Sequence, residues 1–191
     1  MSERNTALRS MHDLGLAAWF GGSLMGAVGL NSAAGAEGGT WRNTARIASV
    51  GWAKWTPVNA AAITVHLVGS SGLLGVNAVR VATQKGVAAS TIAKTVLTGA
   101  ALAATAYSRL LGKKIELASS DSPEALEKAV RHPIDTDKAQ RDLARVQWVL
   151  PVLTGGLIVL NALHGEQQRP AEQLQGMLQR AATLTPWPAM H

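Results

Sequence analysis

The chain has 191 residues, carries no cysteine and has a formal net charge of +6 at pH 7. The lack of cysteine excludes disulfides and thiol chemistry. Hydrophobic residues make up 47% of the sequence, yet a single phenylalanine and a single tyrosine occur beside six tryptophans and 19 glycines. This composition is poor for the aromatic core of a soluble protein, and it suits membrane helices that pack closely through small side chains.

The first apolar segment, residues 14–36, contains no charged side chain. A segment of about 20 apolar residues is long enough to cross the hydrocarbon core of a bilayer. Within it Ala18, Gly22 and Gly26 recur every four residues. Because such a spacing places small side chains on one face of a helix, we expect this stripe to be a helix-packing surface.

The stretch that follows mixes tryptophan with basic residues, which is typical of the headgroup layer. We expect Trp41, Trp52 and Trp55 to be interfacial, with a short interfacial helix over residues 44–54. The second span is predicted at residues 56–79, because Pro57 is well placed in the first turn of a helix.

The third span, residues 89–111, is weaker because Lys94 lies in its first turns. A polar loop then contains a helix that begins near Pro123, and Pro151 interrupts the fourth span. The sequence therefore predicts an all-α fold: an integral membrane four-helix bundle with a polar helical loop between spans three and four. A soluble helical protein is the alternative that the weak third span leaves open. The remaining expected elements are the polar loop at 112–140, the fourth span at 146–165 and an amphipathic tail at 171–184, all within a single membrane domain that covers residues 1–191.

More than half of the 18 lysine and arginine residues lie in or next to the first and third connections between spans. This distribution favours both termini outside the cytoplasm. We expect a multi-pass protein of the cell membrane whose partners are the lipid bilayer and other membrane subunits or further copies of itself. No nucleic-acid partner is expected, because the basic residues flank apolar segments and no nucleic-acid-binding motif is present.

The sequence contains no phosphate-binding loop, zinc pattern or nucleophile elbow, so we expect neither enzymatic activity nor a cofactor. The candidate metal ligands are His12, His66 and His164, because imidazole suits copper and haem iron. His12 and His164 belong to the same side of the membrane in a four-span topology and could approach each other. His66 lies near the middle of its span, where an ionisable residue is costly and is a functional candidate. The alternative for all three is a structural or interfacial histidine.

His12, Trp19, Gly21 and Gly22 form the pattern H-x6-W-x-G-G at the start of the first span. This pattern resembles the opening helix of the copper-resistance CopD domain and of small four-span membrane proteins of the TMEM205 type. The resemblance implies a four-helix membrane fold and copper or haem handling at the histidine. The alanine- and glycine-rich composition and the long third loop are closer to inner-membrane proteins of high-GC bacteria.

Three functions follow from these observations. The favoured function is a structural or accessory subunit of a membrane complex, in which the small-residue stripe mediates helix contact. The second is a copper- or haem-binding membrane protein that uses the histidines. The third is a small transporter or channel, for which Asn59, His66 and Asn77 share one face of the second span, although no other span offers matching polar groups at that depth.

Overall fold

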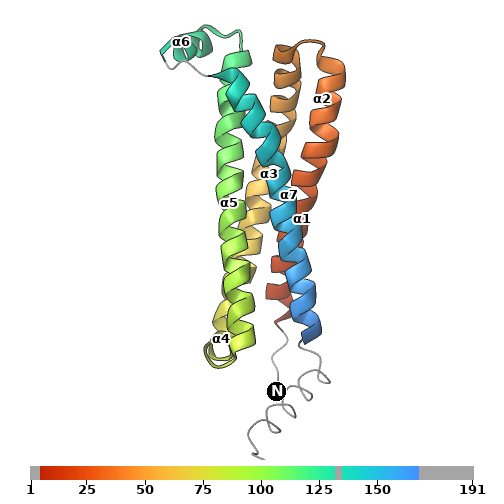
Figure 1. Ribbon diagram of the computed structural model, residues 1–191, viewed down its shortest axis with the longest axis vertical. Helices are drawn as coiled ribbons and strands as arrows, with labels where there is room; N and C mark the ends of the chain where they lie inside the picture. The colour runs from red at the N-terminus through yellow and green to blue at the C-terminus, as the bar shows by residue number, and fades with distance from the viewer. Residues whose placement is uncertain (1–4, 132–134, 168–191) are drawn as a thin grey trace, which may run out of the picture.

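A computed structural model describes residues 5–131 and 135–167. Four long helices run antiparallel to one another and form a bundle, and the start of the first lies at the same end as the end of the last (Figure 1). Nearly all of the described part is helical and it contains no strand, which confirms the predicted all-α four-helix fold. The expected amphipathic tail at 171–184 lies outside the described residues. Four helical segments are long and apolar enough to cross a membrane: Thr6–Gly38, Trp41–Val76, Gly86–Ser119 and Thr136–Leu163.

The first of these segments contains a single π-helical turn. It consists of α1 (Thr6–Met25), the π turn η1 (Gly26–Leu30) and α2 (Asn31–Gly38). A π turn inserts one extra residue, so the inward face continues from Gly26 to Asn31, five residues on, rather than to Leu30. Ala34 is fully buried on that continued face. Gly39 then ends the segment with φ of 66°, a conformation that glycine adopts without strain.

The next helix, α3 (Trp41–Val76), is longer than the sequence predicts. The separate interfacial helix at 44–54 was a wrong prediction, because that stretch is the first third of α3. Pro57 lies inside the helix and not at its start. Helix α3 continues through this proline, as membrane helices commonly do. Beside it, Thr56 Oγ1 donates a 2.8 Å hydrogen bond to the carbonyl of Trp52, and the rings of Trp52 and Trp55 pack against Gly26 and Gly22.

The remaining chain is helical with short connections. The long helix α7 also continues through its internal Pro151, so this proline does not interrupt the fourth span as expected. Outside the apolar band lies α6, which is the helix expected to begin near Pro123. The elements in this part are α4 (Ala78–Thr83), α5 (Lys85–Ser119), α6 (Pro123–Arg131) and α7 (Thr136–Gln167).

Helix α1 packs along α3, and α5 packs along α7. The contact between α1 and α3 depends on two glycines. A Cβ atom on Gly15 would meet the backbone of α3, and one on Gly69 would meet the backbone of α1. The core of the bundle is a buried cluster that draws on three of the long helices: Leu16, Trp19, Ala101 and Leu157.

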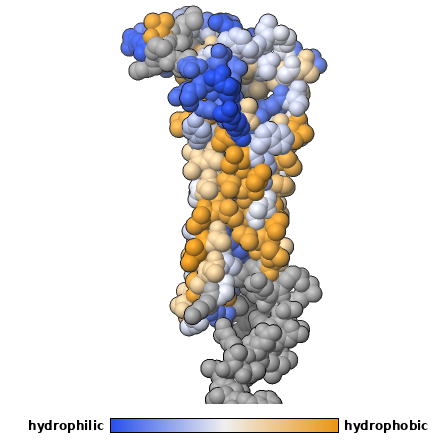
Figure 2. Space-filling view, in the orientation of Figure 1, coloured by the Kyte–Doolittle hydropathy of each residue, from blue (hydrophilic) through white to orange (hydrophobic). Residues whose placement is uncertain are grey.

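The outer surface of the bundle is apolar around its middle, while hydrophilic residues gather at the end that carries α6 (Figure 2). Large hydrophobic side chains are exposed on the apolar part of this surface, including Val96, Val152 and Val159. A soluble protein rarely exposes so continuous an apolar surface. This surface, together with the four long apolar helices, fits a lipid bilayer and a multi-pass membrane protein.

Candidate functional site

A cavity of about 430 Å³ lies between the four long helices, toward the end of the bundle that carries α6. We call it the upper cavity. Its volume falls in the range that small-molecule sites usually have, about 300–1,000 Å³. Apolar side chains form most of its wall. Its polar residues come from every long helix, and they are Ser23, Asn31, Thr44, Ser49, Thr56, Asn59, Thr105, Ser108, Arg109, Glu116, Gln140 and Gln147.

Four of the six tryptophans also line the upper cavity: Trp19, Trp41, Trp52 and Trp55. Of the three that the sequence assigned to the interface, Trp41 is 44% exposed, and the guanidinium of Arg42 lies 5.5 Å from the centre of its ring. The other two, Trp52 and Trp55, are half-buried. The rings of these two point inward between the helices and help to form the cavity wall.

The predicted small-residue stripe faces those two indoles. A Cβ atom on Gly22 would collide with the ring of Trp55, and one on Gly26 would collide with the ring of Trp52. Ala18, the first residue of the stripe, is half-buried. The two glycines therefore make room for aromatic rings of α3, whereas close backbone approach occurs at Gly15 and Gly69.

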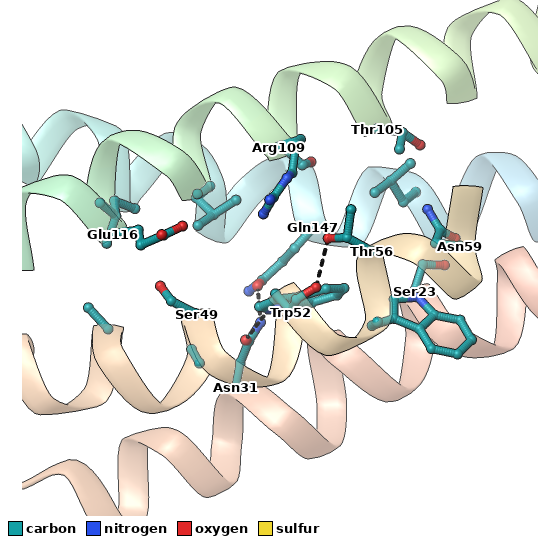
Figure 3. A pocket seen from close by; sticks show the side chains of 18 of the residues that line it. Ser23, Asn31, Ser49, Trp52, Thr56, Asn59, Thr105, Arg109, Glu116 and Gln147 are labelled. Carbon is teal, nitrogen blue, oxygen red and sulfur yellow. Dashed lines mark hydrogen bonds between the residues drawn. The ribbon is translucent and has the colours of Figure 1, made fainter. Parts of the chain in front are cut away.

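A hydrogen-bonded network holds one side of the cavity (Figure 3). Asn31 accepts a 3.0 Å hydrogen bond from Trp52 Nε1 through its side-chain oxygen and donates its amide to Gln147 Oε1. Three helical segments, α2, α3 and α7, are joined in this way. The π turn η1 makes the network possible, because it brings Asn31 onto the inward face of its helix.

The lining of the cavity also contains polar atoms without partners. Among the described residues, three buried side-chain polar atoms make no hydrogen bond: Trp19 Nε1, Asn59 Oδ1 and Ser108 Oγ. All three residues line the upper cavity, and they come from α1, α3 and α5. An unpaired buried polar group costs about 1–3 kcal/mol, so three of them around one cavity suit an additional polar molecule.

Two charged side chains of α5, Arg109 and Glu116, reach into the same space (Figure 3). Glu116 forms an ion pair with Lys113 at 2.7 Å. The described residues give Arg109 no carboxylate partner. Since Glu116 is already paired with Lys113, the described wall offers a cation no unpaired carboxylate.

Two of the three candidate histidines lie side by side. His12 lies against His66, with the ring centres 4.5 Å apart. His66 is 1% exposed, and its Nδ1 donates a 3.0 Å hydrogen bond to the backbone carbonyl of His12. The side chain of the third candidate, His164, lies outside the described part, so the expected approach of His12 to His164 stays a prediction.

Both histidines use Nδ1 to bond an oxygen atom. His12 Nδ1 lies 2.8 Å from the carboxylate of Asp13, as His66 Nδ1 lies near a carbonyl. In neutral rings with these tautomers, each Nε2 keeps its lone pair. Ser70 Oγ lies 3.5 Å from His66 Nε2 but donates to the backbone carbonyl of His66 at 2.8 Å. The described residues offer no group of three or more metal-ligating side chains. A metal ion would therefore have only His12 and His66 as ligands.

A second cavity of about 510 Å³ lies toward the opposite end of the bundle, beside α4 (Ala78–Thr83). We call it the lower cavity. Its charged and titratable residues are Arg9, His12, Asp13 and Lys94. Lys94, which made the third span weak in sequence, is half-buried in this wall. Its other polar residues are hydroxyls and amides from the long helices, among them Ser70, Asn77, Thr95, Thr98 and Asn161.

Comparison with known proteins gives no relative. No protein-family model, curated protein or solved structure matches this chain. The resemblance to CopD and TMEM205-type proteins therefore stays a prediction from the first helix.

Sequence reasoning missed the upper cavity. It found polar groups at depth only on the second span, at Asn59, His66 and Asn77. Ser108 of α5 and Gln147 of α7 nevertheless line the same cavity as Asn59. Ser108 gave no signal, because a lone serine in an alanine-rich helix is common. A search for polar residues at equal depth from the Trp-rich end would have found this group.

Proposed function

We propose that this chain is a multi-pass protein of the cell membrane that binds a small uncharged molecule carrying a hydroxyl or amide group in the upper cavity. The observation that carries this proposal is the set of unpaired polar atoms on its wall. Trp19 Nε1 can only donate a hydrogen bond, and Asn59 Oδ1 can only accept one. A hydroxyl group both donates and accepts, so it satisfies both kinds of atom, while the tryptophan rings contact the apolar part of the molecule.

The test uses the tryptophans as reporters. Tribromoethanol carries a hydroxyl, and its bromine atoms quench tryptophan fluorescence; tribromomethane is the matched compound without a hydroxyl. Purified protein in lipid nanodiscs is titrated with each compound. We expect saturable quenching by tribromoethanol at a concentration at least tenfold lower than for tribromomethane. Equal, non-saturable quenching by both compounds would contradict the proposal.

A cavity-filling variant makes the test specific. Gly112 lines the upper cavity, and a Cβ atom there meets no atom within 4 Å. Gly112→Leu therefore adds volume at an unobstructed point of the cavity wall, and it favours the helix by up to about 1 kcal/mol. Gly21→Leu is the matched control, because Gly21 is exposed and equally unobstructed. Saturable quenching should disappear in Gly112→Leu and persist in Gly21→Leu.

The pair formed by His12 and His66 supports a second candidate, copper binding. Metal-ligating histidines usually donate the other ring nitrogen to a carbonyl or carboxylate, which is the arrangement of both Nδ1 atoms here. Copper(I) would be held by the two Nε2 atoms. Haem fits less well, because ring centres 4.5 Å apart leave no space for a porphyrin between the two imidazoles.

The accessory-subunit role expected from the sequence stays a proposal with less support. Its argument was the stripe of Ala18, Gly22 and Gly26. Because Gly22 and Gly26 accommodate the rings of Trp55 and Trp52 within the chain, they are not free to contact another subunit.

A further inference from the structure

The upper and lower cavities lie toward opposite ends of the bundle. The upper cavity is lined by residues near the α6 end, such as Thr44 and Gln140, and the lower cavity by residues near α4, such as Val81. Because the long helices are long and apolar enough to cross a membrane, the two cavities would lie toward its two sides.

Three polar residues follow one face of α3 and its C-cap from one cavity toward the other. Asn59 lines the upper cavity and Asn77 lines the lower one. His66 lies between them along the same helix and is 1% exposed. Polar groups inside a membrane helix are costly and commonly follow a solute pathway.

A thin apolar layer separates the cavities. It is the buried cluster of Leu16, Trp19, Ala101 and Leu157. Trp19 belongs both to this layer and to the wall of the upper cavity, and Leu157 belongs both to the layer and to the wall of the lower cavity. This one cluster of side chains therefore closes the inner end of both cavities. A solute in either cavity meets it as a barrier.

We infer that this chain conducts a small uncharged hydroxyl compound across the membrane, with the layer of Trp19 and Leu157 as its closed gate. The solute carries a hydroxyl group because the upper cavity presents both an unpaired donor, Trp19 Nε1, and an unpaired acceptor, Asn59 Oδ1. This inference rests on the proposed function for the chemistry of the solute, while the two-sided pathway follows from the cavities themselves.

The first experiment tests the sidedness of the cavities. The chain has no native cysteine, so each introduced thiol is the only one. Ser49→Cys places a thiol in the upper cavity and Thr98→Cys places one in the lower. A membrane-impermeant, charged methanethiosulfonate is added to one side of sealed vesicles at a time. We expect each variant to react from one side only, and the two variants from opposite sides. Val159→Cys, which is 58% exposed on the apolar surface, is the unreactive control.

The second experiment measures glycerol efflux from proteoliposomes by light scattering. Leu157→Ala shortens the gate, and we expect it to raise the rate at least tenfold over the unaltered protein. Gly99 lines the lower cavity and is unobstructed, so Gly99→Leu should block the pathway, as should Gly112→Leu in the upper cavity. Gly21→Leu should conduct like the unaltered protein. Because the three leucine variants add volume in open space, their result does not depend on how well Leu157→Ala folds.

The outcomes separate the inference from the proposed function. Reaction of Ser49→Cys and Thr98→Cys from the same side, or glycerol efflux that Gly99→Leu and Gly112→Leu leave unchanged, overturns the pathway even if tribromoethanol binds. Opposite-sided reaction with efflux blocked by both variants supports the pathway even if tribromoethanol fails to bind. In that case only the proposed binding of a brominated alcohol is contradicted.

Discussion

Gly15 of α1 faces the backbone of His66 so closely that a Cβ atom there would stand 2.5 Å from the His66 nitrogen. Neither partner can move aside, because both contacts involve helix backbone. We expect Gly15→Ala to lower the stability of the bundle by about 1–3 kcal/mol, the usual cost of overpacking. The midpoint of thermal unfolding in detergent measures this loss. Gly21→Ala is the control and should unfold at the same or a higher temperature, since its added methyl meets open space.

Gly22→Leu should displace the indole of Trp55, because the new side chain would occupy the position of that ring. The displaced tryptophan leaves the cavity wall, so we expect a shift in the tryptophan emission maximum together with a lower unfolding temperature. Gly35→Leu on the neighbouring α2 adds the same side chain where nothing lies within 4 Å. An unchanged emission spectrum in Gly22→Leu would show that the contact is not as described.

Asn31→Ala should leave Trp52 Nε1 without its acceptor and Gln147 without its donor. We expect a loss of about 1–3 kcal/mol for each buried group that finds no new partner. Combining Asn31→Ala with Gln147→Ala should cost less than the sum of the two single changes, since both remove the same bond. Additive losses in thermal or denaturant unfolding would mean that the two side chains act independently. Asn43→Ala, at an exposed position, should stay within about 0.5 kcal/mol of the unaltered protein.

Copper, if it binds, should depend on both His12 and His66. We expect protein extracted in mild detergent and loaded with copper(I) to retain about one ion, and either His12→Ala or His66→Gln to lose it. Metal analysis with an absorption spectrum gives the content. Glutamine at 66 can still donate to the carbonyl of His12, so the unfolding temperature should change little. Copper retained at full content in His66→Gln would remove this residue as a ligand.

The number and type of the long helices could be predicted from the sequence, because an uncharged apolar segment has few alternatives to crossing a bilayer. The helix ends were less predictable. Pro57 suggested a helix start, but a proline inside a membrane helix is tolerated, and α3 continues through it here.

The candidate site was less predictable than the fold, because it depends on contacts between helices. The stripe of Gly22 and Gly26 was visible, but its partners, Trp55 and Trp52, looked like headgroup residues beside Arg42 and Lys54. The pairing of His12 with His66 requires the crossing point of α1 and α3, which Gly15 and Gly69 set. Nothing in the spacing of these residues along the chain indicates that crossing point.

The π turn at Gly26–Leu30 has a consequence for how the molecule can vary. Deleting one residue there would restore a plain α-helix in which Asn31 follows Gly26 by four residues. Asn31 and Ala34 would then keep the inward face, and Trp52 would keep its hydrogen-bond acceptor. Deleting a residue from the regular α-helix of α1 would instead rotate everything beyond it by about 100°. The turn is therefore a place where the chain can lose one residue while the wall of the upper cavity keeps its shape.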